Sequence, residues 1–181
     1  KTNGGKFPQI LFLENHGIFV AGDNADAVGE LACGILSRIH NEINGGEPFS
    51  DFEPSDDFDI DRAVLVAPVL RMLYSDGTSE AVVKFECSRA LLDYDTSVKS
   101  LTPDHIVYTK ASQLVLSSDV CEEGIISEFK AFTEKNGYKP RIVIVKGLGI
   151  FACGKNAKEA ETAREVFVDA VKIAYFAKAF G

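Results

Sequence analysis

The sequence lacks the features that mark membrane proteins and nucleic-acid-binding proteins. Its apolar residues never form a run near the roughly 18–20 residues that a membrane span needs, and its first residues show no signal-peptide pattern. Lysine and arginine number 19 against 27 aspartates and glutamates, and they form no cluster. The net charge of −8 therefore excludes, as our expectation, both nucleic acid and an anionic membrane surface as partners.

Cysteine is also scarce, and its spacing matches no common cysteine motif. The four cysteines lie far apart and contain no Cys-x-x-Cys pair; they are Cys33, Cys87, Cys121 and Cys153. Each lies in an apolar or helical context. We therefore expect four buried free thiols in a reducing compartment, and hence a cytoplasmic protein.

In other respects the composition is that of an ordinary folded protein. Hydrophobic residues make up 46% of the 181 residues and charged residues 25%, which excludes a mostly disordered chain. This length fits one domain or two closely packed halves with a sizeable core. The single methionine is Met72 and the first residue is Lys1, so we expect the chain to be a piece of a longer protein.

The apolar patterning predicts an α/β fold. Strands are expected within 7–22, at 81–87, at 106–109 and within 141–154; helices are expected from 25 to about 44, at 63–75, at 122–136 with Gly137 as the C-cap, and at 157–180. Residues 89–98 are expected to be helical or irregular. Together these segments predict a mostly antiparallel central sheet, built from both hairpins and the two other strands, with helices on its faces.

An acidic stretch divides the chain. Asp57, Asp59 and Asp61 have the spacing of a calcium loop, but Arg62 and Pro68 stand where an EF-hand needs glycine and glutamate. A solvated connector is therefore predicted. The expected organisation is a first strand–strand–helix unit at 1–45, an acidic connector at 46–62, a middle α/β segment at 63–138, and a second, degenerate strand–strand–helix unit at 139–181.

The most informative feature is an internal repeat. When Pro8 is placed over Pro140, a shift of 132 residues, the two strand–strand–helix units align. Residues 17–19 (GIF) then meet the identical residues 149–151, and the apolar positions of the two following helices coincide. The repeat predicts that the two units have the same local structure.

The two copies differ at the break between their strands. The first copy has Asn15-His16-Gly17, and the second has Gly147-Leu148-Gly149. Because glycine would satisfy a tight turn in both copies, the histidine suggests a displayed ligand or an acid–base group. The alternative is a histidine whose ring is hydrogen-bonded to backbone.

Three segments carry a resemblance to a known family. Residues 13–22 (LENHGIFVAG) resemble the Asn-His-Gly segment of the class II aldolase/adducin family. Residues 101–110 (LTPDHIVYTK) and 140–154 (PRIVIVKGLGIFACG) resemble the later part of the aldolase region of bifunctional rhamnulose-1-phosphate aldolase/alcohol dehydrogenases. The resemblance implies an α/β/α fold, a homo-oligomer, and an attached short-chain dehydrogenase domain.

The resemblance also implies a reaction and a site. In that family zinc or another divalent metal, held by three histidines, polarises the hydroxyketone of a sugar phosphate during retro-aldol cleavage of a ketose 1-phosphate. Carried over, His16 is a metal ligand, and Asn15 and Gly17 contact the substrate. The family's other two ligands form a His-x-His motif, which this chain lacks; its remaining histidines are His40 and His105. No residue is assigned the proton transfer, and the chain alone is expected to be inactive.

Three functions stay open. The chain is the later half of a metal-dependent sugar-phosphate aldolase, or a non-catalytic, degenerate aldolase/adducin-like domain for binding or oligomerisation, or a carrier or regulatory segment for an attached dehydrogenase. Nicotinamide binding by the chain itself is disfavoured. The Gly-x-Gly at Gly147 is followed by Ala152 and Gly154 and lacks the helix that a dinucleotide fingerprint requires.

Overall fold

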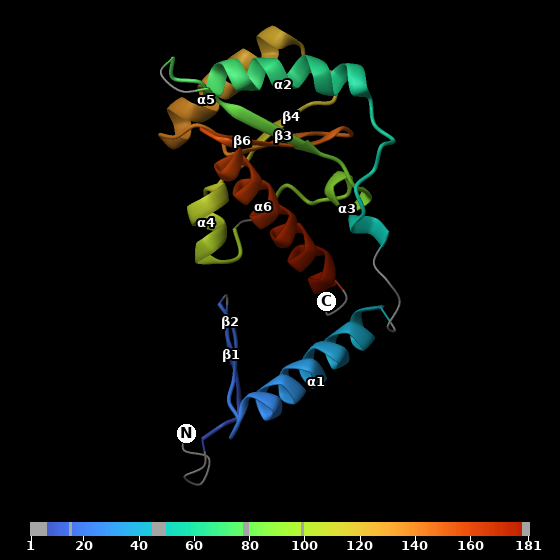
Figure 1. Ribbon diagram of the computed structural model, residues 1–181. Coiled ribbons are helices and arrows are strands. Elements are labelled where there is room, and N and C mark those ends of the chain that lie inside the picture. Colours follow the sequence, from blue (N-terminus) through green and yellow to red (C-terminus); the bar gives the residue numbers. More distant parts are fainter. Residues whose placement is uncertain (1–6, 15, 45–49, 78–79, 99, 179–181) are drawn as a thin grey trace. The chain divides into compact units, whose positions relative to one another are not determined.

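The computed structural model describes residues 7–14, 16–44, 50–77, 80–98 and 100–178. The chain divides into two compact units, and their described parts lie within residues 7–44 and 50–178 (Figure 1). Each unit has its own strands and helices, and the two are described in turn.

The first unit is a hairpin followed by a long helix. Strand β1 (Ile10–Leu13) pairs antiparallel with β2 (Gly17–Val20), and helix α1 (Ala25–Asn44) follows. The side chain of Asn24 accepts a hydrogen bond from Ala27 N at 2.9 Å, which satisfies one of the free N–H groups at the start of α1.

The second unit is a four-stranded mixed sheet with helices on both faces. Its elements are a 3-10 turn at Ser50–Phe52, α2 (Ile60–Tyr74), β3 (Val82–Glu86), α3 (Arg89–Leu92), α4 (Pro103–Thr109), β4 (Leu114–Leu116), α5 (Glu122–Asn136), β5 (Ile142–Val145), β6 (Gly149–Gly154) and α6 (Ala157–Ala177). The strand order is β3-β6-β5-β4. Strand β6 pairs antiparallel with both of its neighbours, β3 and β5, whereas β4 pairs parallel with β5. The predicted α/β class is confirmed.

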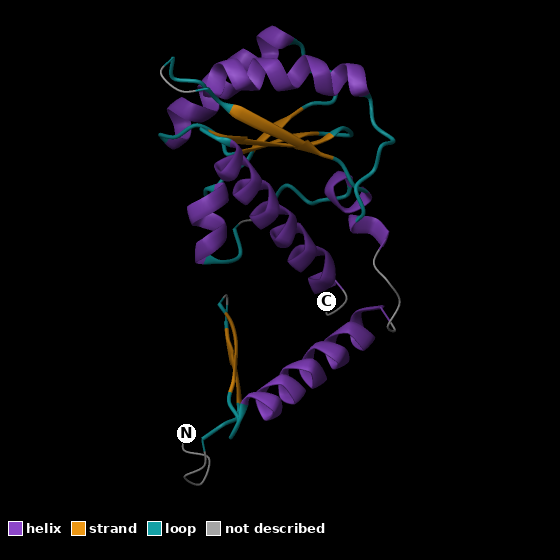
Figure 2. Cartoon of the chain, viewed as in Figure 1, coloured by secondary structure: helices purple, strands orange, loops and turns teal. Residues whose placement is uncertain are grey.

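The hairpin β5–β6 forms the centre of the second unit, and its residues alternate between two apolar layers. Val143, Val145 and Phe151 pack with residues of α2 and α5. On the other face, Ile142 and Ile150 pack with residues of α3 and α6. Figure 2 shows this sheet between α2 and α5 on one side and α6 on the other. The core therefore has both faces of the hairpin covered by helices.

Two features of the predicted sheet are wrong. Strands β1 and β2 pair in a two-stranded sheet of their own, so the described hairpins do not share one sheet. Residues 106–109 belong to helix α4, because Thr102 Oγ1 accepts from His105 N at 3.3 Å and Pro103 stands at the first helical position. This N-terminal cap outweighs the β-branched residues that follow. The strand beside β5 is instead β4, which the sequence analysis missed.

The two strand–strand–helix units share hydrogen bonds at positions 132 residues apart. Ala21 N donates to Gln9 O in the first unit, as Cys153 N does to Arg141 O in the second, both at 2.8 Å. In the turns, His16 N donates to Leu13 O at 3.2 Å and Leu148 N to Val145 O at 3.0 Å. The side chains of Asn24 and Asn156 cap the following helices, each with a hydrogen bond of 2.9 Å. The strand registers also agree, since Leu13 lies opposite Gly17 and Val145 lies opposite Gly149. The two copies therefore share the register of their hairpins and the cap of the helix that follows.

Glycine at the junction of strand and helix is part of that design. A Cβ at Gly154 would lie 2.4 Å from Ala160 N, and one at Gly22 would lie 3.2 Å from Val28 N. The first turn of each helix thus lies directly against the end of the preceding strand. Only a residue without a side chain fits this approach in the second copy.

The acidic stretch ends in a helix cap. Asp59 Oδ1 accepts from Arg62 N at 3.0 Å and begins α2, which continues through Pro68. Asp59 therefore has a local structural role in the acidic stretch.

We expect Gly154→Ala to destabilise the second unit by about 1–3 kcal/mol, because the added methyl group meets backbone that cannot move aside. This corresponds to a fall of several degrees in the melting temperature, measured by circular dichroism. The matched control is Gly22→Ala, where the contacts are longer. An unchanged melting temperature for Gly154→Ala would contradict the close approach.

Candidate functional site

The predicted site lies at the turn between β1 and β2. Asn15 lies outside the described residues. His16 is exposed in the turn, and Gly17 begins β2 with φ at +151° and open space at the position of a Cβ. Among the other histidines, His40 is exposed on α1, and His105 is buried in α4. The turn thus presents His16 and Gly17 side by side.

The described residues do not supply a complete metal site. Within them, no group of three histidine, cysteine, aspartate or glutamate side chains is placed to hold a metal ion. Zinc sites use three or four protein ligands, so the chain's own described residues do not fit a bound zinc ion. His16 can contribute one ligand only.

The turn in the second copy has an equivalent hydrogen bond and an equivalent glycine, but a different environment. Gly149 has φ at +142°, close to the value at Gly17. Leu148, the counterpart of His16, is 4% exposed and packs in the apolar cluster on the α2–α5 side of the sheet. The position that carries the imidazole in the first copy is therefore a core position in the second copy.

A pocket of about 350 Å³ borders the turn between β5 and β6. It lies between Lys146 and Gly147 of the turn and the segment after α3, including Tyr94 and Asp95. Gly147 is the counterpart of Asn15, the residue predicted to contact the substrate. The counterpart of that predicted position therefore lines a pocket in the second copy. The sequence identified the turn but not its neighbours in residues 91–96, because that contact is long-range.

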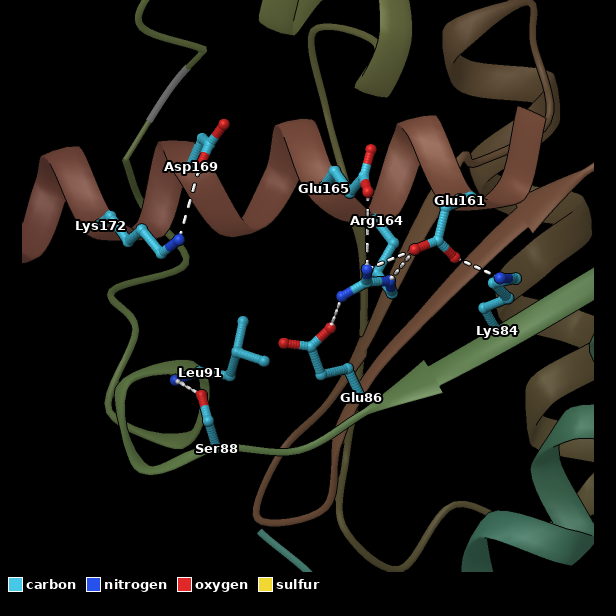
Figure 3. Close-up of polar contacts among 9 residues, drawn as sticks. All are labelled: Lys84, Glu86, Ser88, Leu91, Glu161, Arg164, Glu165, Asp169 and Lys172. Carbon is cyan, nitrogen blue, oxygen red and sulfur yellow. Dashed lines mark hydrogen bonds and ion pairs between the residues drawn. The ribbon is translucent and has the colours of Figure 1, made fainter. Parts of the chain in front are cut away.

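The densest group of charges in the second unit joins β3 to α6 (Figure 3). Arg164 on α6 forms ion pairs with Glu86 of β3 and with Glu161, and Lys84 of β3 also pairs with Glu161. Arg164 Nη2 lies 3.9 Å from Glu165 Oε1. The sequence analysis missed this network because its partners on β3 and α6 are 77 and 78 residues apart.

This network is suited to holding two elements together and unsuited to proton transfer. Hydrogen bonds from Arg164 and Lys84 lower the pKa of Glu161 to about 2, and the bond to Glu161 raises the pKa of Arg164. Both groups therefore stay charged at neutral pH, whereas a general acid or base needs a pKa near the working pH. The network fastens the edge strand β3 to α6.

His105 is a buried histidine with an unsatisfied ring nitrogen. It is 5% exposed, and its Nδ1 has no hydrogen-bond partner among the residues that the structure describes. Burial lowers its pKa, and the nearby carboxylates of Asp169 and Asp104 oppose this only in part. The ring is therefore neutral at pH 7 and belongs to the packing between α4 and α6.

The expectation of four buried thiols is wrong for two of them. All four cysteines are free, but only Cys87 and Cys153 are buried, whereas Cys33 and Cys121 are exposed. Cys33 lies on an exposed part of α1, and Cys121 is the residue before the first turn of α5. Burial raises the pKa of Cys153 to about 12 and also raises that of Cys87.

No known protein family, characterised protein or solved structure matches the chain. Among the described helices, none is both long and apolar enough to cross a membrane.

Acidification should destabilise the second unit through His105. Its folded pKa lies below its ordinary value of 6.5, so the unfolded chain binds more protons as the pH falls below that value. The contribution of neutral His105 to the free energy of unfolding is thus present above pH 6.5 and is lost as the pH falls below it. We expect His105→Met to flatten the pH dependence of urea unfolding between pH 7.5 and 5, with His40→Met as the control. An unchanged slope would contradict this role.

The cysteines should divide into two reactive classes. In the native chain we expect two thiols, Cys33 and Cys121, to react rapidly with an aromatic disulfide reagent, because only exposed thiolates are attacked. The other two should react only after unfolding in urea. Rapid reaction of all four native thiols would contradict the buried placement of Cys87 and Cys153.

Proposed function

We propose that the chain is part of a metal-dependent sugar-phosphate aldolase, in which His16 supplies one ligand to zinc or another divalent ion. The observation that carries this proposal is the contrast at one turn of the repeat. Two hairpins share their backbone bonds, yet one presents an exposed imidazole where the other has a buried leucine. The imidazole is therefore not needed to form the turn.

The surroundings of His16 suit a ligand. The open space at Gly17 leaves room beside the imidazole for a bound group. Asn15, next in the chain, is proposed to contact the substrate together with Gly17. The proposed substrate is a ketose 1-phosphate that undergoes retro-aldol cleavage, and a bound divalent metal would polarise its carbonyl.

The remaining ligands must come from other parts of the protein. A catalytic zinc ion needs three protein ligands, and a His-x-His motif outside this chain is the proposed source of two. The counterpart position, Leu148, belongs to a core cluster that includes residues of α2, β4 and α5, which precede the hairpin in the chain. This favours ligands that also precede β1. A cytoplasmic location, a homo-oligomer and an attached short-chain dehydrogenase domain complete the proposal.

A second candidate function, oligomerisation without catalysis, is favoured by an exposed apolar stripe on α2. The stripe consists of Ile60, Val64, Leu65 and Met72, which recur at helical spacing and are all exposed. Such a stripe on the surface fits a second unit that acts in assembly of the oligomer.

The proposal is tested by the metal content of the natural gene product. Wild-type protein should bind zinc with one ion per site and release dihydroxyacetone phosphate from ketose 1-phosphates. For His16→Ala we expect zinc affinity to fall by at least about 10–100-fold. Removing a residue that only hydrogen-bonds to a metal ligand already has an effect of about this size, and the loss of a ligand itself should be no smaller. Metal analysis after dialysis and a coupled cleavage assay provide the readouts.

The matched control is His40→Ala, which removes an exposed histidine from the same unit. It should keep both zinc and activity. Equal zinc content in the wild-type protein and His16→Ala would remove His16 from the metal site. Absence of zinc and of cleavage in the wild-type product would favour the oligomerisation function.

A further inference from the structure

The first unit exposes the side chains whose counterparts form the core of the second unit. Phe12 is 65% exposed, whereas Ile144, 132 residues later, is 5% exposed. Phe19 is 56% exposed, and its identical counterpart Phe151 is fully buried. Exposed apolar surface of this extent on paired strands is typical of a surface that another element covers.

The second unit shows what covers such a hairpin. Strand β3 pairs with β6, and β4 pairs with β5, so both edges of the hairpin are occupied. Helices α2 and α5 pack on one face, and α3 joins α6 on the other. In the first unit, the described residues provide only the counterpart of α6, which is α1.

A groove in the first unit is lined by apolar residues whose counterparts in the second unit are buried. It measures about 350 Å³ and lies between β1 and α1, where Ile10, Leu31 and Ile35 line it. Their counterparts Ile142, Ala163 and Phe167 are buried in one apolar cluster, to which α3 contributes Ala90 and Leu91. The same positions are therefore covered in the second unit, where α3 belongs to the covering cluster, and border an open groove in the first.

The surface of α1 also leaves room for a strand. Gly29 has open space around the position of a Cβ, and its counterpart Glu161 is the residue that pairs with Lys84 of β3. A glycine inside a helix costs about 1 kcal/mol relative to alanine. At this position it permits a close neighbour on the side where β3 lies in the complete copy.

We infer that the apolar surface of β1, β2 and α1 is covered by a segment of the same polypeptide that precedes β1 and is built like residues 60–136. In the second unit, these elements precede the hairpin in the chain, and a duplicated domain keeps that order. The first unit is then the closing part of another complete copy of the domain. This inference depends on the repeat and is independent of metal binding at His16.

A second copy of this chain is a poorer occupant. Its second unit has both sheet faces already covered by its own helices. Its first unit offers only another open hairpin, without counterparts of α2, α3 and α5 in the described residues. Neither surface reproduces the cover that β5 and β6 receive.

Hydrogen exchange measured by mass spectrometry tests the inference. The 181-residue chain and the natural gene product, both treated with EDTA, are compared at peptides covering β1 and β2. We expect these amides to exchange about 10²-fold more slowly in the natural product, because the covered hairpin opens only with its domain. Peptides covering β5 and β6 are the internal control and should be protected in both samples.

Two matched variants provide a second readout. In the natural product, Phe19→Ser and Phe151→Ser should each lower the melting temperature of one transition by roughly 10 °C. In the 181-residue chain, only Phe151→Ser should do so. The EDTA treatment separates this test from the metal test, because loss of zinc leaves the expected protection unchanged.

Three outcomes would overturn the inference. A natural product of 181 residues would leave no preceding segment. Protection of β1 and β2 in the 181-residue chain, rising with protein concentration, would assign the cover to a second copy. Rapid exchange of β1 and β2 in both samples would show that this surface is uncovered.

Discussion

The fold depends on burying a hairpin that is apolar on both faces. The sequence of β5 has four consecutive aliphatic residues, Ile142–Val145, and all four are buried. Two strands alone cannot bury both faces, and an isolated hairpin is at best marginally stable in water. Neighbouring strands on both edges and helices on both faces are therefore required. The other elements of the second unit supply this cover, and the ion pairs of Arg164 secure its outermost strand to a helix.

Much of this architecture could be predicted from the sequence because its signals are local. The apolar runs in residues 141–154, broken at Gly147, predict the hairpin, and Glu122–Asn136 with Gly137 at its end predicts α5. The alignment of the two copies predicted their shared structure, which the matching hydrogen bonds confirm. A pattern that recurs within one chain is stronger than either copy alone, because chance would have to produce it twice.

The failures have physical causes as well. Residues 106–109 have β-branched side chains, but the cap provided by Thr102 and Pro103 decides their conformation. Strand β4 has only three residues, too few to show a period, and its pairing with β5 is long-range. Of the candidate site, the sequence located the turn at His16. It could not show that the counterpart position is a core position or which segment borders it, because those contacts depend on tertiary packing.

The shared backbone of the two turns separates folding from chemistry at one position. The bonds around the turn involve main-chain atoms, and a glycine provides its positive φ in each copy. The side chain of His16, like that of its counterpart Leu148, takes no part in these turn bonds. After a gene duplication, an imidazole at this position could therefore be replaced by leucine in one copy while the turn kept its shape. The leucine would even add to the core. The turn therefore accepts either side chain, and the packing around it distinguishes the two copies.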